Sequence, residues 1–552
     1  MALSRVNAVI VGSGPGGGTV AKELSEAGLS VVMLERGKWH TIEDHGHDEL
    51  WSQRTSVLGC PFGPDNERHR RVVKEGDSWN VVLPTENYKN NAACVGGGSF
   101  SYGAMAWRFM PQSFRMKSTY GPVEGSSVED WPISYDELEP YYEKAEIEVG
   151  VSGDYSQTPF APPRKKPLPM PPLSYTREGR ILEPAARRLG WHPFPVAMAR
   201  NSVPYNGRPA CARVKYCVGF ACAWNARAGS HNTVIPVALA TGNCELRTES
   251  TVSKVLMNDR GIATGVGYFD ANDRYQEQPA DIVIVSGSAT ESPRLLLNSP
   301  HRLWPNGLCN NNDWVGRNLQ AHAYTGAYGL FEGDTYDDIG PGADLAVADF
   351  CHNNPGLKGG GLLCNEFIRL PYLFTNVRPP GSKSWGLKHK RFQREQYRRC
   401  VRVVGPVEDM PNFESRVEVD PTVTDHWGIP VSRISGARNP NDRIIAEFMA
   451  DKADTWLKKA GAVETWKTLP GMGVSAGQHQ AGTCRMGNDP QTSVVNRHCQ
   501  SHEIDNLFVV DGSVHVTNGT FNPALTIFAV AFWASDYIKQ QWKSGAFRAG
   551  NG

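Results

Sequence analysis

The sequence predicts an α/β fold with two lobes, one built on a parallel sheet and the other on an antiparallel sheet covered by helices. Three observations support this fold class. First, a strand, a glycine-rich turn and a helix follow one another at the N-terminus. Second, apolar strands that run into glycines recur near residues 285 and 510, so the parallel lobe is discontinuous in sequence. Third, residues 323–417 contain several Tyr, Phe and Trp, which suits a second, sheet-based lobe.

A strand–turn–helix–strand unit opens the chain, with strands at residues 7–11 and 29–34 and a helix at residues 19–27. The turn contains Gly12, Gly14 and Gly17 in a Gly-x-Gly-x-x-Gly pattern, and Glu35 ends the second strand. Gly12 permits the tight turn, Gly14 lets the backbone approach a pyrophosphate, and Gly17 lets the helix pack on the strand. Glu35 is placed to accept hydrogen bonds from an adenosine ribose. This Rossmann-like context predicts a bound dinucleotide, either NAD or FAD.

Composition excludes several classes of function. The chain has 552 residues, with 57 basic and 57 acidic side chains. Because there is no basic excess, nothing points to nucleic-acid binding or to an anionic membrane. No segment is long and apolar enough to span a membrane, and the short apolar N-terminus runs into the glycine turn rather than resembling a signal peptide. We therefore expect a cytoplasmic protein.

The C-terminal segment distinguishes FAD from NAD. His479 begins the run His479–Gly487, and Asn522 precedes a helix that starts at Pro523. The positive end of that helix could face a reduced, anionic flavin. His479 is suited to accept a hydroxyl proton near neutral pH, and the amide of Asn522 can hold the same oxygen. The alternative is a structural histidine and an N-cap asparagine, and on spacing alone both interpretations stay open.

Five ordered motifs give the chain an end-to-end resemblance to a known family. They are the N-terminal glycine fingerprint, Gly97–Ser99, Ser286–Leu296, Val315–His322, and the paired segments around His479 and Asn522. In this order and spacing they resemble the glucose–methanol–choline (GMC) oxidoreductases. The resemblance implies an FAD-dependent enzyme that oxidises a CH–OH group, with a flavin lobe and a substrate lobe.

The resemblance also implies roles for individual residues. His479 falls at the first catalytic position and Asn522 at the second, so that His479 takes the hydroxyl proton while the hydride goes to the flavin N5. Val252 falls where a backbone group contacts adenine, and Asp511 and Gly512 fall where the ribityl chain and pyrophosphate are held. The expected cofactor-binding residues are Gly12, Gly14, Gly17, Glu35, Arg36, Gly97, Gly98, Ser99, Val252, Asp511, Gly512, Asn522, Pro523 and Thr526.

The chain is expected to divide into five segments. Residues 1–155 form a first FAD-binding part with a cofactor-covering loop, and residues 156–230 form a connection that contains cysteines. Residues 231–320 form a second FAD-binding part, residues 321–470 a substrate-binding lobe, and residues 471–552 a C-terminal FAD-binding and catalytic segment. Within the first segment, residues 41–89 are polar and are expected to be irregular. Residues 246–269 read as paired strands with a turn at residues 258–261.

The cofactor linkage and the substrate class also follow from the resemblance. Some family members bind FAD covalently through a histidine after the second glycine loop; Ser99–Gly103 contains none, so we expect non-covalent FAD. Within the family, the chain is most similar to sugar-oxidising bacterial members, namely the gluconate dehydrogenase catalytic subunit and the pyranose or glycoside oxidases. The segments that carry this similarity are Trp107–Phe109, Cys217–Cys222 and His479–Asn496. The expected substrate is a sugar, glycoside or sugar acid, with dioxygen or a quinone-type acceptor. A non-sugar alcohol, or a catalytic subunit that works with a small partner subunit, remains an alternative.

Three of the 12 cysteines are close together in sequence. Cys211, Cys217 and Cys222 could hold an iron–sulfur cluster, or they could be buried free thiols in a loop. Their spacing matches no standard cluster pattern, so we assign no metal to them.

Overall fold

The computed structural model describes residues 3–44, 48–50, 62–65, 68–84, 86, 92–367 and 369–547. Its helices are α1 (Pro15–Glu26), α2 (Met116–Tyr120), α3 (Tyr135–Val149), α4 (Arg177–Arg188), α5 (Val234–Ala240), α6 (Glu291–Leu297), α7 (Pro371–Phe374), α8 (Gly386–Gln396), α9 (Pro440–Ala460) and α10 (Ala524–Ser544). Its strands are β1 (Val6–Val11), β2 (Val31–Leu34), β3 (Arg71–Glu75), β4 (Ser78–Val82), β5 (Phe194–Pro195), β6 (Cys244–Arg247), β7 (Thr251–Met257), β8 (Ala263–Phe269), β9 (Tyr275–Val285), β10 (Ala323–Leu330), β11 (Leu345–Val347), β12 (Leu363–Asn365), β13 (Cys400–Val407), β14 (Arg416–Thr424), β15 (Pro430–Ser435), β16 (Glu464–Thr468) and β17 (Leu507–Val509).

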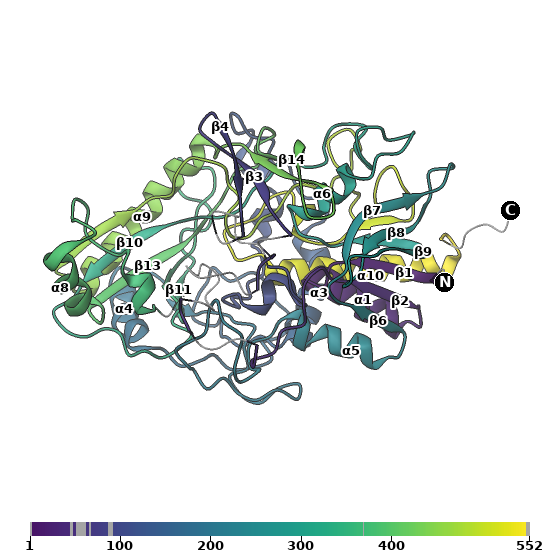
Figure 1. Ribbon diagram of the computed structural model, residues 1–552. Helices are drawn as coiled ribbons and strands as arrows, with labels where there is room; N and C mark the ends of the chain where they lie inside the picture. Colours follow the sequence, from purple (N-terminus) through teal and green to yellow (C-terminus); the bar gives the residue numbers. More distant parts are fainter. Residues whose placement is uncertain are drawn as a thin grey trace.

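A parallel sheet forms the core of the lobe on the right of Figure 1. Its strands follow the order β6-β2-β1-β9-β17, and Val9 of β1 lies opposite Val32 of β2 and Val283 of β9. The N-terminal half of β9 pairs instead with β8 in an antiparallel ribbon that continues into β7. Because β1, β9 and β17 come from distant parts of the chain, the predicted discontinuous parallel lobe is confirmed.

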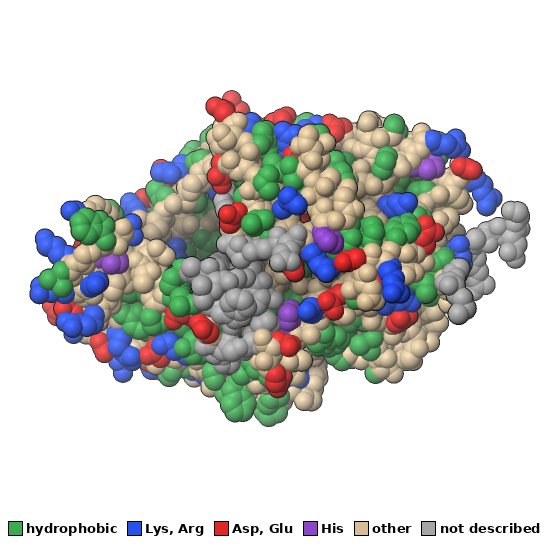
Figure 2. All heavy atoms as spheres, in the orientation of Figure 1, with side chains coloured by type: hydrophobic (Ala, Val, Ile, Leu, Met, Phe, Trp, Pro, Cys, Tyr) green, Lys and Arg blue, Asp and Glu red, His purple; other side chains and the backbone are tan. Residues whose placement is uncertain are grey.

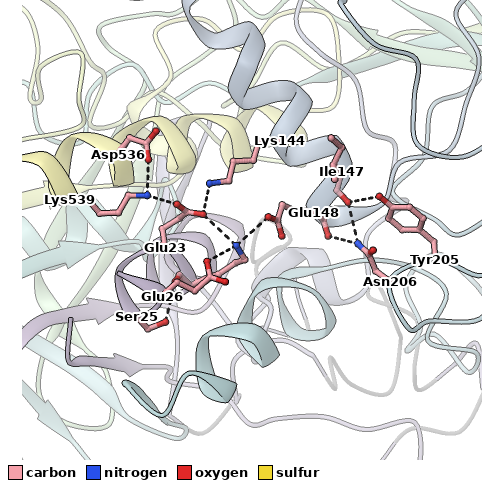
Figure 3. A network of polar contacts seen from close by, with 11 residues as sticks. Glu23, Ser25, Glu26, Lys144, Ile147, Glu148, Tyr205, Asn206, Asp536 and Lys539 are labelled. Carbon is pink, nitrogen blue, oxygen red and sulfur yellow. Dashed lines mark hydrogen bonds and ion pairs between the residues drawn. The ribbon is translucent and has the colours of Figure 1, made fainter. Parts of the chain in front are cut away.

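Helices α1, α3 and α10 are linked in this lobe by ion pairs around the buried carboxylate of Glu23 (Figure 3). The carboxylate of Glu23 on α1 lies 2.6 Å from Lys144 of α3 and 2.6 Å from Lys539 of α10. Burial alone would raise the pKa of Glu23, but the two ammonium groups outweigh it and hold the pKa below its usual range. Lys22, next in sequence, pairs with Glu148 of α3 at 3.3 Å. These contacts fix the helix whose N-terminus follows the glycine turn.

The second lobe, on the left of Figure 1, is built on a six-stranded antiparallel sheet in the order β16-β10-β13-β12-β11-β5. Helix α9 packs across β10, β13 and β16, and α4 packs on α9. The apolar core between sheet and helices includes Val403, Ile445 and Trp456, all fully buried. The predicted α/β class with a helix-covered antiparallel sheet is therefore confirmed. None of the described helices is long and apolar enough to cross a membrane.

A third, four-stranded sheet in the order β14-β15-β3-β4 corrects one sequence-based expectation. Residues 41–89 were expected to be irregular, but β3 and β4 form a hairpin within them. Val72 and Val73 of β3 pair in parallel with Arg433 and Ile434 of β15, and both valines are buried. The strand therefore depends on a distant partner, which the local sequence does not reveal.

Candidate active site

One large cavity, with a volume of about 360 Å³, lies where the glycine turns of the first lobe meet β10 of the second. It brings together most of the residues predicted to hold the cofactor and the two predicted catalytic residues. The predicted residues that line it are Gly12, Gly14, Glu35, Arg36, Gly97, Gly98, Ser99, Val252, His479, Asp511, Gly512, Asn522 and Pro523.

The first glycine turn shows why each of its glycines is needed. Gly12 has a φ of +98°, and a Cβ there would overlap the carbonyl oxygen of Ser286. A Cβ on Gly14 would meet no protein atom within 4 Å, and Gly14 lines the cavity, so its backbone is open to a ligand. Gly17 does not line the cavity; a Cβ there would overlap the carbonyl oxygen of Gly12, so Gly17 allows α1 to pack against the turn.

The carboxylate of Glu35 is held at the end of β2. Its Oε2 accepts hydrogen bonds from the backbone N–H of Ser13 at 3.0 Å and from the Ser13 hydroxyl at 2.6 Å. Its Oε1 accepts from the N–H of Gly37 at 2.9 Å. Arg36 pairs with Glu291 at 3.3 Å. A buried carboxylate oriented in this way fits the hydroxyls of a ribose.

The second glycine loop packs directly on the first. A Cβ on Gly97 would lie 3.2 Å from the Cα of Gly14. A Cβ on Gly98, like one on Gly14, would meet no protein atom within 4 Å. Gly98 also lines the cavity. The hydroxyl of Ser99 donates to the carbonyl of Gly96 at 2.6 Å and accepts from the N–H of Ser230 at 3.0 Å. This serine therefore fixes the loop that covers the cavity.

Asp511 holds the third segment of the cavity wall. Its Oδ1 accepts from the N–H of Ser513 at 2.7 Å, and its Oδ2 accepts from the N–H of Ser288 at 2.9 Å and the hydroxyl of Ser292 at 2.5 Å. The N-terminus of α10 follows at Pro523, which also lines the cavity and brings the positive helix end there. Thr526 does not reach the cavity: its hydroxyl bonds to that of Tyr142 at 2.8 Å.

His479 and Asn522 meet at the cavity wall. The Nε2 of His479 lies 3.2 Å from the Nδ2 of Asn522. The indole N–H of Trp107 donates to the Oδ1 of Asn522 at 3.0 Å, so the amide group of Asn522 points toward His479 and toward the hydroxyl of Tyr324, 3.2 Å away. The side chain of Asn522 makes no capping bond to α10, whose N-cap residue is Pro523.

His322 determines which nitrogen of His479 carries a proton. The Nε2 of His322 lies 2.8 Å from the carbonyl oxygen of Gly519, so that nitrogen must be the donor. Burial lowers the pKa of His322 to about 4, and the ring is neutral near pH 7. Its Nδ1 therefore accepts a hydrogen bond from the Nδ1 of His479, 2.8 Å away. In neutral His479 the lone pair is then at Nε2, where it faces the amide N–H of Asn522 at 3.2 Å.

The backbone of His479 is also constrained. Its φ of +65° lies in the left-handed region, which residues with a side chain seldom adopt. The amide of Asn518, fully buried, donates to the carbonyl of His479 at 2.7 Å and holds this conformation. A conformation of this kind at a cavity wall indicates a position that the fold maintains despite local strain.

Sequence reasoning missed three members of this arrangement. Trp107 and His322 were identified only as parts of family motifs, and Tyr324 was not singled out. The signal for Tyr324 was its position two residues after His322: alternate residues of a strand share a face. Nothing in the sequence connects Trp107 with Asn522, since 415 residues separate them.

The cysteine cluster lies apart from this cavity. Cys211, Cys217 and Cys222 line a small second pocket together with Arg200 and Arg227. In the described part of the chain, no group of three or more His, Cys, Asp or Glu is arranged to hold a metal ion. The structure therefore gives no support to an iron–sulfur site among these three thiols.

Family models and known proteins match this chain over most of its length. Two family models described as GMC oxidoreductase match residues 91–324 and 411–531, and one described as FAD binding domain matches residues 5–55. The chain is 32% identical to a 2-methyl-1,2-propanediol dehydrogenase of Mycolicibacterium austroafricanum, over 98% of this chain and 96% of that protein. It is 28% identical to a gluconate 2-dehydrogenase flavoprotein of Pantoea cypripedii, over 98% and 94%. It is 27% identical to a fructose dehydrogenase large subunit of Gluconobacter japonicus, over 97% and 98%.

Proposed function

Because the chain belongs to the GMC oxidoreductase family, an FAD-dependent group acting on CH–OH donors, we propose that it oxidises a hydroxyl-bearing carbon of a sugar, glycoside or sugar acid. The observation that carries the proposal is the His479–Asn522 pair at the wall of the cavity that also contains the glycine turns. The resemblance to the gluconate and fructose dehydrogenases supports the substrate class.

The residues of the cavity fit FAD. The open backbone at Gly14 suits a pyrophosphate, and the fixed carboxylate of Glu35 suits the adenosine ribose. When bound, FAD supplies the hydride-accepting atom, N5. We propose that it is held without a covalent bond, because among the described residues that line the cavity the only histidine is His479, which we place at the substrate. Acid precipitation should then release all of the flavin into the supernatant.

In this proposal His479 and Asn522 act on the substrate hydroxyl. The lone pair at the Nε2 of His479 accepts the proton of the substrate hydroxyl as the hydride leaves the carbon that bears this hydroxyl. The amide of Asn522 donates to the substrate oxygen and holds the C–H bond in line for transfer. His322 is a positioning residue, because its Nδ1 holds the proton of neutral His479 on Nδ1 and so leaves the lone pair at Nε2.

A small aliphatic diol is the second candidate substrate. The 2-methyl-1,2-propanediol dehydrogenase is 32% identical over nearly the full length of both chains. Tyr324 and Phe367 line the cavity, which gives it apolar surface for such a molecule. For the electron acceptor we propose dioxygen or a quinone-type molecule. Action with a small partner subunit is supported by the likeness to a protein described as a large subunit.

We also propose a cytoplasmic location. The eleven described cysteines are all free, which is the state that a reducing compartment maintains. Fractionation of cells that express the full chain would test this.

Anaerobic stopped-flow mixing of the FAD-loaded protein with sugars, sugar acids, glycosides and small diols tests the function. We expect the flavin absorbance to bleach with one class and to return on admitting air or a quinone. The His479→Asn variant should retain FAD but lose the bleaching. His426→Asn, at a histidine with a 45% exposed side chain, is the matched control and should reduce normally. A protein that binds no FAD, or that loses nothing in His479→Asn, would contradict the proposal.

A further inference from the structure

The end of the second lobe carries a dense group of basic side chains. Between residues 378 and 399 there is a single acidic residue, Glu395, and eight basic ones: Arg378, Lys383, Lys388, Lys390, Arg391, Arg394, Arg398 and Arg399. Three of these arginines face carboxylates, namely Arg394, Arg398 and Arg399. No described carboxylate lies within ion-pair distance of the other five basic side chains. Although the whole chain is neutral, this region is therefore strongly positive.

Helix α8 lies at the tip of this region, at the left edge of Figure 1. None of its residues is buried, but its inner side is attached: the ring of Phe392 stacks on Phe374 with centroids 6.1 Å apart. The amide of Gln393 donates to the carbonyl of Val377 at 3.2 Å. The helix is thus held to the lobe on one side and exposes the other.

Two large apolar side chains stand among these charges. Trp385 is 68% exposed and Leu387 is 64% exposed, the highest values among the large apolar residues of the described chain. The ammonium of Lys383 lies 4.8 Å from the centroid of the Trp385 ring. Figure 2 shows basic side chains gathered at this end of the molecule, with apolar side chains between them. Solvent alone is a poor environment for an exposed indole beside a leucine.

We propose that Trp385, Leu387, Lys388, Lys390 and Arg391, which we call the α8 surface, dock the enzyme on an anionic phospholipid surface. Lysines and arginines attract acidic headgroups, and each contributes to binding within a Debye length of the membrane. Tryptophan and leucine insert at the headgroup boundary, where an indole has both an apolar and a polar environment. This mode of binding requires no spanning helix. An acidic protein would satisfy the charges but gives no reason for the two apolar side chains.

Vesicle flotation of the FAD-loaded, full-length protein tests the proposal. Vesicles of phosphatidylcholine alone are compared with vesicles that also contain phosphatidylglycerol, at low and at high salt. We expect flotation only with phosphatidylglycerol, with a clear decrease at high salt because the attraction is screened. Flotation with neither kind of vesicle at low salt, or equally with both, would overturn the proposal.

Matched variants locate the surface. Lys388→Gln, Lys390→Gln and Arg391→Gln together should weaken partitioning by roughly 100-fold, since each basic residue contributes about fivefold. Arg260→Gln, Arg274→Gln and Lys459→Gln together remove the same charge at exposed positions elsewhere and should leave partitioning unchanged. Equal loss in both triple variants would contradict a specific α8 surface.

The apolar pair separates a lipid surface from an acidic protein partner. Trp385→Ala with Leu387→Ala should weaken partitioning while the charge stays the same. Unchanged partitioning would overturn the lipid assignment and leave a purely electrostatic contact. The flavin absorbance and the substrate-driven bleaching of each variant report folding and activity separately, so failure of this proposal is distinguishable from failure of the proposed function.

Discussion

Replacement of His322 tests how the protonation state of His479 is set. In His322→Leu the Nδ1–H of His479 loses its acceptor at 2.8 Å, and the preference for an unprotonated Nε2 is lost with it. A buried donor left without its partner costs about 1–3 kcal/mol, which corresponds to roughly a 5- to 150-fold lower rate of flavin reduction. His322→Asn retains an acceptor oxygen near the position of the Nδ1 atom and should recover much of that rate.

The assay is single-turnover flavin reduction under anaerobic conditions, with rate and apparent substrate affinity measured separately. The loss should fall on the rate, because His322 does not line the cavity. His352→Leu is the matched control: it is another buried histidine whose pKa burial lowers to about 4, but its partners are Ser113 and Tyr120. If His322→Leu reduced its flavin as fast as the unmodified protein, or Asn rescued nothing, the reasoning would be refuted.

Three further predictions concern the cofactor site, the amide and the fold. Gly14→Ala should fold but bind FAD more weakly, because its Cβ would meet no protein atom and would take up space at the wall of the cavity. Gly12→Ala should fail to fold stably, because its Cβ would overlap the carbonyl oxygen of Ser286; flavin content and thermal melts distinguish the two variants. Trp107→Phe frees the amide of Asn522 and should lower kcat/KM by roughly fivefold, measured at saturating acceptor. Glu23→Gln should cost about 1–3 kcal/mol in the free energy of unfolding at pH 7, less than a fully buried pair would, because Lys144 and Lys539 are partly exposed. Because the pKa of Glu23 is lowered in the folded state, this loss of stability should be fully present above the pKa of the unfolded state. It should shrink as the pH falls through the pKa of the folded state, and denaturant melts at several pH values would detect this.

The local parts of this fold could be predicted because they depend on near neighbours in sequence. The β1–α1–β2 unit and helix α10 follow from apolar periodicity and glycine placement, and both appear within a few residues of the expected bounds. The β3–β4 hairpin could not be predicted in this way. Its strand β3 is stabilised by β15, more than 350 residues later in the chain.

The candidate site was likewise predictable only where it depends on residue type and not on distant contacts. The residue types of His479 and Asn522 indicated proton transfer and positioning, and the structure brings their side chains to 3.2 Å. The proton arrangement was not predictable, because it depends on the carbonyl of Gly519 acting through His322, 197 residues away. Backbone carbonyls carry no residue-specific signal, so a chain of contacts that ends on one is invisible in the sequence.

The position of β9 between β1 and β17 has a consequence for biosynthesis. During synthesis β1 is made before β9 and β17 only after it, and the cavity wall also needs Asn522 and Pro523, which follow β17. A growing chain therefore leaves the ribosome with one edge of β9 unpaired, and such an edge is open to wrong partners until β17 emerges. We therefore expect FAD to bind only after the segment that contains Asn522 and Pro523 has folded against β9, and its binding then stabilises the folded chain.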